Sequence, residues 1–170
     1  MSSEKHGAVV EQGWQMLNTF AGVGVGCVDV TNLDGQKCSF RPRQSLELVR
    51  SWLLVEMAST VQRQRNVIVR PRGAAVALIR LDDLGGTTVE RVRGAAFSIL
   101  ATSLNNHQAW VAVQDCRPDF ARRLRQGSGA DPSASGAVRI AGSSNFKRRY
   151  APNYPVITIL EAILNASSPR

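Results

Sequence analysis

The segment at residues 139–150, RIAGSSNFKRRY, combines short polar side chains with a dense group of basic ones. Its basic residues are Arg139, Lys147, Arg148 and Arg149. Ammonium and guanidinium groups bind phosphate oxygens, and arginine can do so through two parallel hydrogen bonds. Gly142 allows a close approach of the backbone to a ligand, and Asn145 adds a short polar contact. The segment favours a polyanionic ligand over a small neutral one, and a solvated basic loop is the alternative interpretation.

Two adjacent carboxylates, Asp82 and Asp83, follow an apolar run at residues 75–81. Carboxylates at the end of a buried strand can line a cleft at the rim of a sheet. Mg²⁺ takes one or two carboxylates together with substrate phosphates, and two such ions can stabilise the attacking and leaving oxygens of nucleotidyl transfer. Asp131, which precedes the basic segment, is the candidate third carboxylate. An ordinary strand-to-turn pair and an Asp-Pro turn are the alternative interpretations.

A polar stretch at residues 103–108 precedes Trp110 and reads as the tip of a hairpin. His107 in this stretch is a candidate contact to a phosphate or a ribose, although a histidine at a turn is more often simply exposed. Trp110 has the spacing of a strand residue, which favours a place in the core over a role as a platform for base stacking.

The charge of the chain is strongly basic and unevenly distributed. It has 170 residues, 44% hydrophobic and 20% charged, with a net charge of +8. Residues 117–149 hold eight basic and two acidic side chains, or +6 of the +8. A basic stripe of this kind indicates a nucleic-acid partner. The candidate DNA contacts are Arg122, Arg123, Arg125, Arg148 and Arg149.

Several function classes are poorly supported. The three cysteines, Cys27, Cys38 and Cys116, include no Cys-x-x-Cys pair, which argues against a disulfide framework or a zinc knuckle. The two histidines, His6 and His107, are not at metal-ligand spacing, and neither a Gly-x-Ser-x-Gly elbow nor a P-loop occurs. No apolar run has the length of a membrane span. We expect a reduced, cytoplasmic protein.

Helical and strand patterns alternate along the chain and predict an α+β sandwich, with helices packed on a mixed sheet in one domain over residues 1–170. The expected helices lie at residues 4–20, 45–62, 87–94 and 118–126, with a short one from residue 161. The expected strands lie at residues 23–30, 37–41, 67–70, 75–81, 97–103, 108–114 and 156–160. The strand at 75–81 shows little alternation, which indicates cover on both faces.

Four segments in order resemble the catalytic domain of RepB-type replication primases, members of the archaeo-eukaryotic primase superfamily found on plasmids and mobile elements. The segments are NVIVRP at 66–71, LIRLDDL at 78–84, TSLNNHQAWV at 102–111 and RIAGSSNFK at 139–147. The resemblance covers residues 66–159 and implies an RRM-like, primase-polymerase type core over about 66–160. Residues 4–62 would form an N-terminal helix-hairpin-helix extension.

The resemblance also implies an activity, its cofactor and the roles of several residues. The activity would be the synthesis of short primers on single-stranded DNA from nucleoside triphosphates with Mg²⁺ or Mn²⁺, alongside other replication or transfer proteins. Asp82, Asp83 and Asp131 would bind the metal. Ser103 and Gln108 would lie near the triphosphate, and Arg139, Asn145 and Lys147 would contact the incoming nucleotide or template phosphate.

Two other functions remain open at this point. One is a non-catalytic DNA-binding accessory protein of replication or transfer with a degenerate primase fold. The other is an interaction protein whose arginines reflect composition alone. The primase interpretation requires the aspartates and the basic segment to face each other across one groove.

Overall fold

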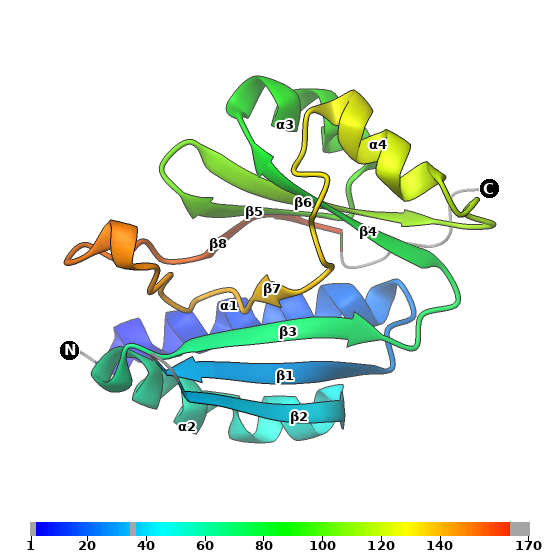
Figure 1. The fold of residues 1–170 in the computed structure, drawn as a ribbon. Helices are drawn as coiled ribbons and strands as arrows, with labels where there is room; N and C mark the ends of the chain where they lie inside the picture. Colours follow the sequence, from blue (N-terminus) through cyan, green and yellow to red (C-terminus); the bar gives the residue numbers. More distant parts are fainter. Residues whose placement is uncertain (1–2, 35–36, 164–170) are drawn as a thin grey trace.

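The computed structural model describes residues 3–34 and 37–163, which fold into helices and antiparallel strands (Figure 1). The helices are α1 (Ser3–Gly22), α2 (Leu46–Arg63), α3 (Gly86–Val92) and α4 (Phe120–Ser128), with 3₁₀ turns η1 (Arg93–Ala95) and η2 (Arg148–Tyr150). The strands are β1 (Cys27–Asp34), β2 (Lys37–Ser45), β3 (Asn66–Arg72), β4 (Ala77–Leu84), β5 (Ser98–Ser103), β6 (Asn106–Val113), β7 (Val138–Arg139) and β8 (Thr158–Ala162).

The strands form two four-stranded sheets. The first has the order β2-β1-β3-β7 and the second the order β4-β6-β5-β8. The predicted α+β class is confirmed. The sheets differ from the expected mixed sheet, because every strand pairing in the described ranges is antiparallel. Hydrophobic periodicity predicts that a strand is half-buried, but it does not specify the strand's partner or where the chain crosses between sheets.

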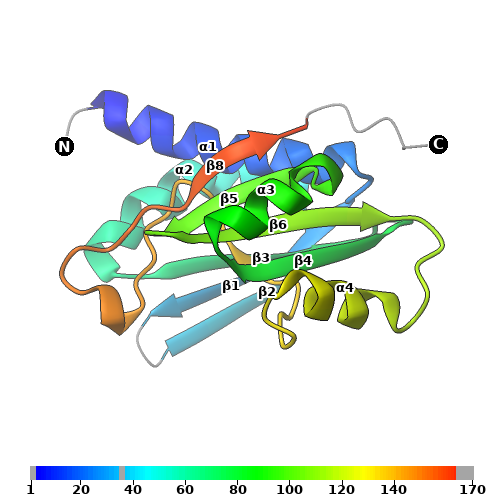
Figure 2. The same cartoon turned by 90° about the horizontal axis from the view of Figure 1, so that it is seen from above.

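The helices lie on different sides of the two sheets. Helices α3 and α4 cover the outer face of the second sheet, whereas α1 and α2 lie behind the first (Figures 1 and 2). Ser45 caps α2 by accepting a hydrogen bond from the Leu48 amide, as the sequence predicts. Of the helices within the described ranges, none is long and apolar enough to cross a membrane.

The larger core cluster joins α1 and α2 to both sheets. Trp110 is fully buried in it, with its ring edge-on to Phe20 at 5.2 Å between centroids. The predicted core position of Trp110 is therefore confirmed. A second cluster lies between the second sheet and α3 and α4. Leu78 of β4 packs on the first cluster and Ile79 and Leu81 on the second, so this strand is covered on both faces, as predicted.

The prediction of a helix from residue 161 is wrong over residues 161–162. These residues belong to β8, where Ala162 pairs with Ser98 and Glu161 with Ile99 of β5. The edge of β5 offers free amides and carbonyls, and a ladder with that edge satisfies them where a short helix would not. The other helices form where the sequence predicts them, with ends that differ by a few residues.

Candidate functional site

A polar cavity of about 230 Å³ lies between the two sheets. Strands β4, β5 and β6 supply one wall, and β3 and β7 supply another. The lining residues are Ile68, Arg80, Asp82, Asp83, Thr102, Asn106, Gln108, Ser135, Ala137, Val138, Arg139, Asn145, Lys147, Arg149, Tyr150 and Ile157. Acidic and basic side chains distant in sequence thus share one cavity.

The inner face of the second sheet changes from apolar to polar along its strands. Side chains two residues apart share a face of a strand, so Leu78, Arg80 and Asp82 of β4 point the same way. Leu78 packs on the larger core, while Arg80 and Asp82 line the cavity. Gln108 lines it beside the buried Trp110 on β6 in the same manner. The core therefore holds one end of these strands while the other end presents polar groups.

A bulge explains how two adjacent aspartates both reach the cavity. The pairing of β4 with β6 shifts between Leu81 and Leu84, and Asp83 has a φ of 57°. Strict alternation would send the side chain of Asp83 to the opposite face, but a bulge can re-aim a side chain. Aspartate is one of the few residue types that tolerate left-handed backbone. Asn106 Nδ2 holds Asp83 by donating to its Oδ1 at 2.8 Å.

Asp82 lies at the centre of a hydrogen-bond network. Its Oδ1 accepts a hydrogen bond from Gln108 Nε2 at 2.7 Å, and its Oδ2 accepts one from Arg80 Nη2 at 2.8 Å. Arg80 is 8% exposed and also donates to the carbonyl of Ala137. Burial lowers the pKa of Arg80, and the charge of Asp82 opposes that shift. The network holds Asp82 in one orientation at the wall of the cavity.

Three buried polar atoms of the lining residues have no hydrogen-bond partner within the described part of the chain. They are Arg80 Nε, Gln108 Oε1 and Asn145 Oδ1. Buried polar groups are almost always satisfied by protein or water. A bound ligand or ordered water in the cavity would supply partners for these atoms.

The basic wall is held by amides. Arg139 Nε donates to Asn66 Oδ1 at 2.7 Å, and the same oxygen accepts from the Phe146 amide at 3.1 Å. Asn145 Nδ2 donates to the carbonyl of Thr102 at 3.3 Å, which ties this wall to β5. Burial lowers the pKa of Arg139, and the charge of Asp82 opposes that shift. Arg139 is thus a positive charge held at a fixed place in the cavity.

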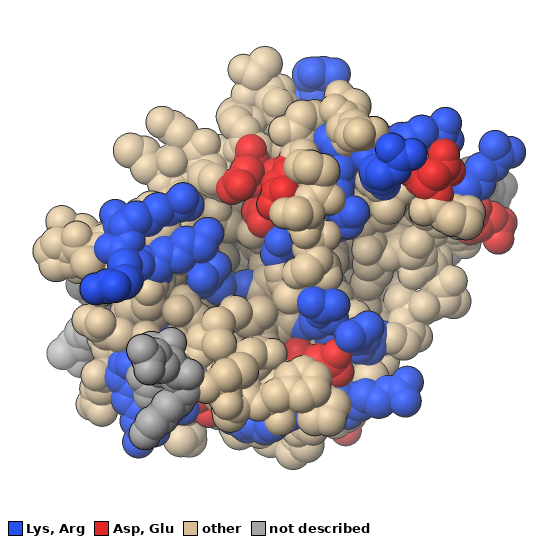
Figure 3. Space-filling model, in the orientation of Figure 1, with Lys and Arg blue, Asp and Glu red and all other residues tan. Residues whose placement is uncertain are grey.

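The mouth of the cavity carries exposed cations around a tyrosine. Lys147 and Arg149 are exposed, and the Arg149 guanidinium lies 4.8 Å from the centre of the Tyr150 ring. The Tyr150 hydroxyl donates to Ser103 Oγ at 2.9 Å and accepts from Arg149 Nη2 at 2.7 Å. Burial disfavours the phenolate, but the hydrogen bonds with Ser103 and Arg149 and the nearby cations together lower the pKa of Tyr150. Space-filling Figure 3 shows basic side chains gathered over η2, with acidic side chains on the same face where β4 ends.

About half of the predicted site residues line this cavity. Those that do are Asp82, Asp83, Gln108, Arg139, Asn145, Lys147 and Arg149. Those that do not are Ser103, His107, Arg122, Arg123, Arg125, Asp131 and Arg148. Ser103 lies in a neighbouring cavity that shares Asn106, Arg149 and Tyr150. His107 Nδ1 is 3.2 Å from the carbonyl of Leu84, where it supports the end of β4.

Asp131 lies beside Asp82 in the backbone, but it is not among the residues that line the cavity. The Asp131 amide donates to the carbonyl of Asp82 at 3.0 Å. Its Oδ1 accepts hydrogen bonds from the Ser133 amide at 2.8 Å and the Ser133 hydroxyl at 2.7 Å. These two bonds lower the pKa of Asp131. Asp131 therefore forms the Asx turn that an Asp-Pro sequence favours, and the described residues contain no cluster of three metal-binding side chains.

The remaining pair of carboxylates still fits a divalent cation. Mg²⁺ sites often combine one or two carboxylates with phosphate oxygens and water. Asp83 is exposed, and its Oδ2 has no partner in the described ranges. Asp82 lies directly before it on the wall of the same cavity. Together they supply hard oxygen donors opposite cations suited to phosphate.

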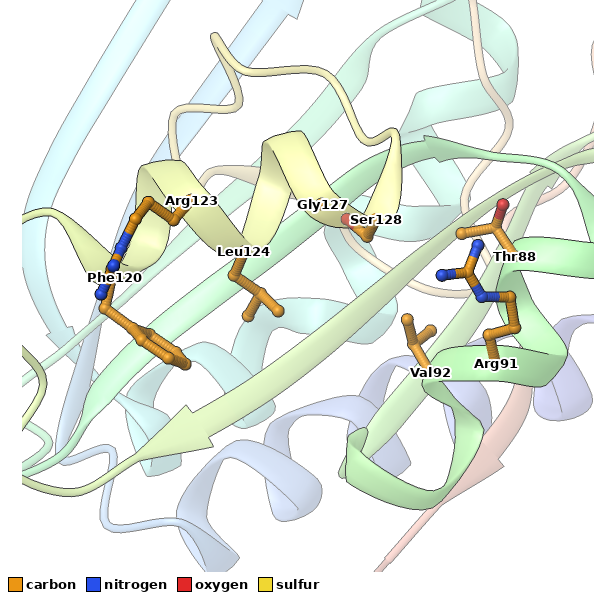
Figure 4. A pocket seen from close by; sticks show the side chains of 8 residues that line it. All are labelled: Thr88, Arg91, Val92, Phe120, Arg123, Leu124, Gly127 and Ser128. Atoms are coloured by element: carbon orange, nitrogen blue, oxygen red, sulfur yellow. The ribbon is translucent and has the colours of Figure 1, made fainter.

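The arginines of α4 belong to another surface. A cavity of about 410 Å³ lies between α3 and α4, and Arg123 is part of its rim (Figure 4). Its apolar floor includes Val92, Phe120 and Leu124, which pack on the second core cluster. Arg125 Nε donates to the carbonyl of Arg80 at 3.1 Å, which fastens α4 to β4.

Gly142 has a different role from the predicted approach to a ligand. Its φ is 85°, and a Cβ built on it would lie 2.0 Å from the carbonyl oxygen of Val9 in α1. Only glycine combines this backbone conformation with so close an approach. The glycine thus lets the chain pass α1, and Gly142 is not among the residues that line the cavity.

Sequence reasoning missed several residues that hold the site. Arg80 supports Asp82, Asn66 supports Arg139, and Tyr150 lies at the mouth. The spacing of Arg80 and Asp82, two apart in a strand, places them on one face and could have identified the pair. Nothing in the local sequence indicates that Asn66 accepts hydrogen bonds from residues 73 and 80 positions later.

Comparison with solved structures gives two closely similar folds. A crystal structure of primase RepB' has a TM-score of 0.75 and 21% sequence identity, covering 91% of this chain and 56% of that one. The catalytic domain of primase RepB' in complex with initiator DNA has a TM-score of 0.73 and 23% identity, covering 89% of this chain and 85% of that one. This chain thus spans little more than half the length of the first structure.

No protein-family profile and no curated protein matches the chain. At this level of identity a structural likeness establishes the fold. The two four-stranded sheets and the helices packed on them therefore form a RepB-type primase fold.

Proposed function

We propose that this chain is a metal-dependent nucleotidyltransferase that synthesises short primers on single-stranded DNA. The observation that carries the proposal is the cavity between the sheets, where two carboxylates face a lysine and two arginines within a primase fold. A polymerising centre needs negative groups for cations and positive groups for phosphates within one site. The DNA-bound structural neighbour supports the choice of substrate.

Each lining residue has a definite task in this proposal. Asp82 and Asp83 would hold Mg²⁺ or Mn²⁺, which supplies positive charge to the phosphates when bound. Arg139 and Lys147 bind phosphate oxygens from the opposite wall. Gln108 fixes the orientation of Asp82 through its hydrogen bond. Charged groups held rigidly in this way need little reorganisation during the reaction.

A non-catalytic DNA-binding protein is the second candidate. It is favoured by Asp131, whose carboxylate binds Ser133 rather than joining the other two. It is also favoured by the engagement of both oxygens of Asp82 within the protein. In this candidate function the basic wall of the cavity binds DNA, but no nucleotidyl transfer takes place.

A primer-synthesis assay with labelled nucleoside triphosphates, Mn²⁺ and a single-stranded template separates the two candidates. The informative variant is Asp83→Asn, because Asp83 is exposed and its replacement tolerates the same backbone conformation. The matched control is Asp115→Asn, another exposed aspartate with positive φ at a turn outside the cavity.

We expect product from the wild type and from Asp115→Asn, and only background from Asp83→Asn. Equal background from all three proteins, with template binding intact, would favour the non-catalytic protein. Equal and substantial product from all three would show that the reaction occurs without the carboxylate of Asp83.

A further inference from the structure

The first sheet has one face covered by helices and one face that leads into the cavity. Val28 and Val30 of β1 and Val67 and Val69 of β3 point into the larger core with α1 and α2. The side chains between them point the other way, and Ile68 among these lines the cavity. The same face carries no helix in Figure 1, where it is turned toward the viewer.

One row of paired residues crosses this face from the sheet edge to the cavity. Phe40 of β2 pairs with Thr31 of β1, Thr31 pairs with Ile68 of β3, and Ile68 pairs with Arg139 of β7. Side chains of paired residues project from the same face. Three strand spacings of roughly 4.8 Å make the row about 14 Å long. Phe40, at its outer end, is 60% exposed.

Arginines lie next to this row. Arg70 and Arg72 follow Ile68 at two-residue spacing on β3, so they share its face. The half-buried side chain of Arg70 makes no hydrogen bond of its own in the described part of the chain, and the Arg72 side chain is 47% exposed. Figure 3 shows basic side chains over the end of β3 that leads toward β4, on the face that holds the cavity mouth.

The acid on this face is neutralised within the protein. Asp29 is 8% exposed and accepts hydrogen bonds from the Arg43 amide at 3.0 Å and from Arg72 Nε at 2.8 Å. The bond from the Arg43 amide, followed by those from Arg72, lowers the pKa of Asp29 against the effect of burial. The charge of Arg70, which pairs with Asp29 in the ladder, adds to this lowering. Two arginines beside one carboxylate leave this part of the face with a net positive charge for an external anion.

We propose that the open face of the first sheet is a track for single-stranded DNA, which guides the strand across β2, β1 and β3 toward Arg139 at the cavity. Phe40 would offer its ring to a base, and Arg70 would bind a backbone phosphate. An exposed aromatic ring beside cations on a sheet is suited to a single strand, because every base has a stacking face and every nucleotide a phosphate. The inference rests on the proposed function for its direction toward the cavity.

The charge and the continuity of this face favour nucleic acid over a protein partner. A protein-binding sheet face would be broadly apolar at its centre, whereas here Arg70 and Thr31 occupy the middle of the sheet. The row also ends at Arg139, which lines the cavity. The face thus joins a stacking residue to a phosphate-binding cavity without a break.

The test measures the binding of a fluorescent oligo(dT) strand by anisotropy over a series of salt concentrations. The variants are Phe40→Ala and Arg70→Gln, with Phe40→Tyr as the conservative change. Matched controls on α2 are Val55→Ala, at a residue 72% exposed, and Arg50→Gln, at an exposed arginine. These controls lie on the helical side of the same sheet.

We expect Phe40→Ala to weaken binding by roughly 5- to 150-fold, the loss typical of one stacked base, and Phe40→Tyr to restore it. Arg70→Gln should reduce the slope of log affinity against log salt by about 0.7, the value for one single-strand phosphate. The α2 controls should bind like the wild type. Wild-type affinity in both Phe40→Ala and Arg70→Gln would overturn the track.

The outcome separates this inference from the proposed function. Primer synthesis abolished by Asp83→Asn, together with normal DNA binding by the Phe40 and Arg70 variants, would refute the track alone. Weakened DNA binding by these variants in a protein without primer synthesis would support the track and refute the reaction.

Discussion

The ion pair between Arg80 and Asp82 makes a strong prediction about stability. The side chains are 10% and 17% exposed, and Arg80 Nη2 lies 2.8 Å from Asp82 Oδ2. When leucine replaces Asp82, the buried Arg80 guanidinium loses its counter-charge. Within the described ranges it then keeps only its hydrogen bond to the Ala137 carbonyl. Removing one partner of a buried pair typically costs about 3–5 kcal/mol. Because the pair borders a cavity that water can enter, we expect a loss of about 3 kcal/mol.

A double-mutant cycle isolates the contribution of the pair. Arg80→Met leaves Asp82 with its bond from Gln108 and some exposure to solvent, so its cost should be smaller than that of Asp82→Leu. The double variant replaces both charges with apolar groups, a change that is often neutral or stabilising for a buried pair. The loss of unfolding free energy in the double variant should therefore be about 2 kcal/mol smaller than the sum of the two single losses.

Urea unfolding followed by tryptophan fluorescence measures each free energy, since Trp110 is buried in the core. The control is Asp83→Asn, which should change stability by no more than about 0.5 kcal/mol because Asp83 is exposed. Losses for Arg80→Met and Asp82→Leu that add within about 0.5 kcal/mol would refute the coupling.

Two further predictions concern Gly142 and Tyr150. Gly142→Ala should destabilise the fold well beyond Gly24→Ala, because both glycines have positive φ but only at Gly142 would the new Cβ meet Val9. Gly24→Ala should cost about 1–2 kcal/mol for its backbone alone; equal losses in thermal unfolding would contradict the clash. In an absorbance titration, Tyr150 should ionise below its ordinary pKa of 10.0, and Arg149→Ala should raise the midpoint by removing a donor and a cation. Since the folded-state pKa lies below the unfolded one, the phenolate stabilises the fold above pH 10, and this is lost as the pH falls through the folded-state pKa. An unchanged midpoint in Arg149→Ala would contradict the account.

The sequence predicts those residues of the cavity wall whose position depends on their immediate neighbours in the chain. An apolar strand that ends in Asp82 and Asp83 must place carboxylates at its end, because the residues before them are drawn into two cores. The basic segment at 139–150 likewise keeps cations near its glycine turn. The aspartates and the basic segment meet because of the fold. Residue spacing alone does not predict that meeting, whereas the resemblance to RepB-type primases implies it.

Other roles depend on contacts that no local pattern specifies. Asp131 is two residues before Ser133, and the two hydrogen bonds from that serine determine where its carboxylate points. His107 binds a carbonyl on the neighbouring strand because of the β4–β6 register. The arginines of α4 have the correct charge, but the helix packs on the outer face of the second sheet. The charge pattern of a sequence shows that the protein has a basic surface, but it does not show where on the fold that surface lies.

The most direct test of the shared cavity is calorimetric titration of a nucleoside triphosphate with and without Mn²⁺. If carboxylates and cations act in one site, Asp83→Asn should weaken binding only when Mn²⁺ is present. Lys147→Ala should weaken it by about tenfold or more under both conditions, because a charge-assisted phosphate contact is lost. Wild-type affinity for both variants, with and without Mn²⁺, would contradict the assignment of this cavity to nucleotide binding.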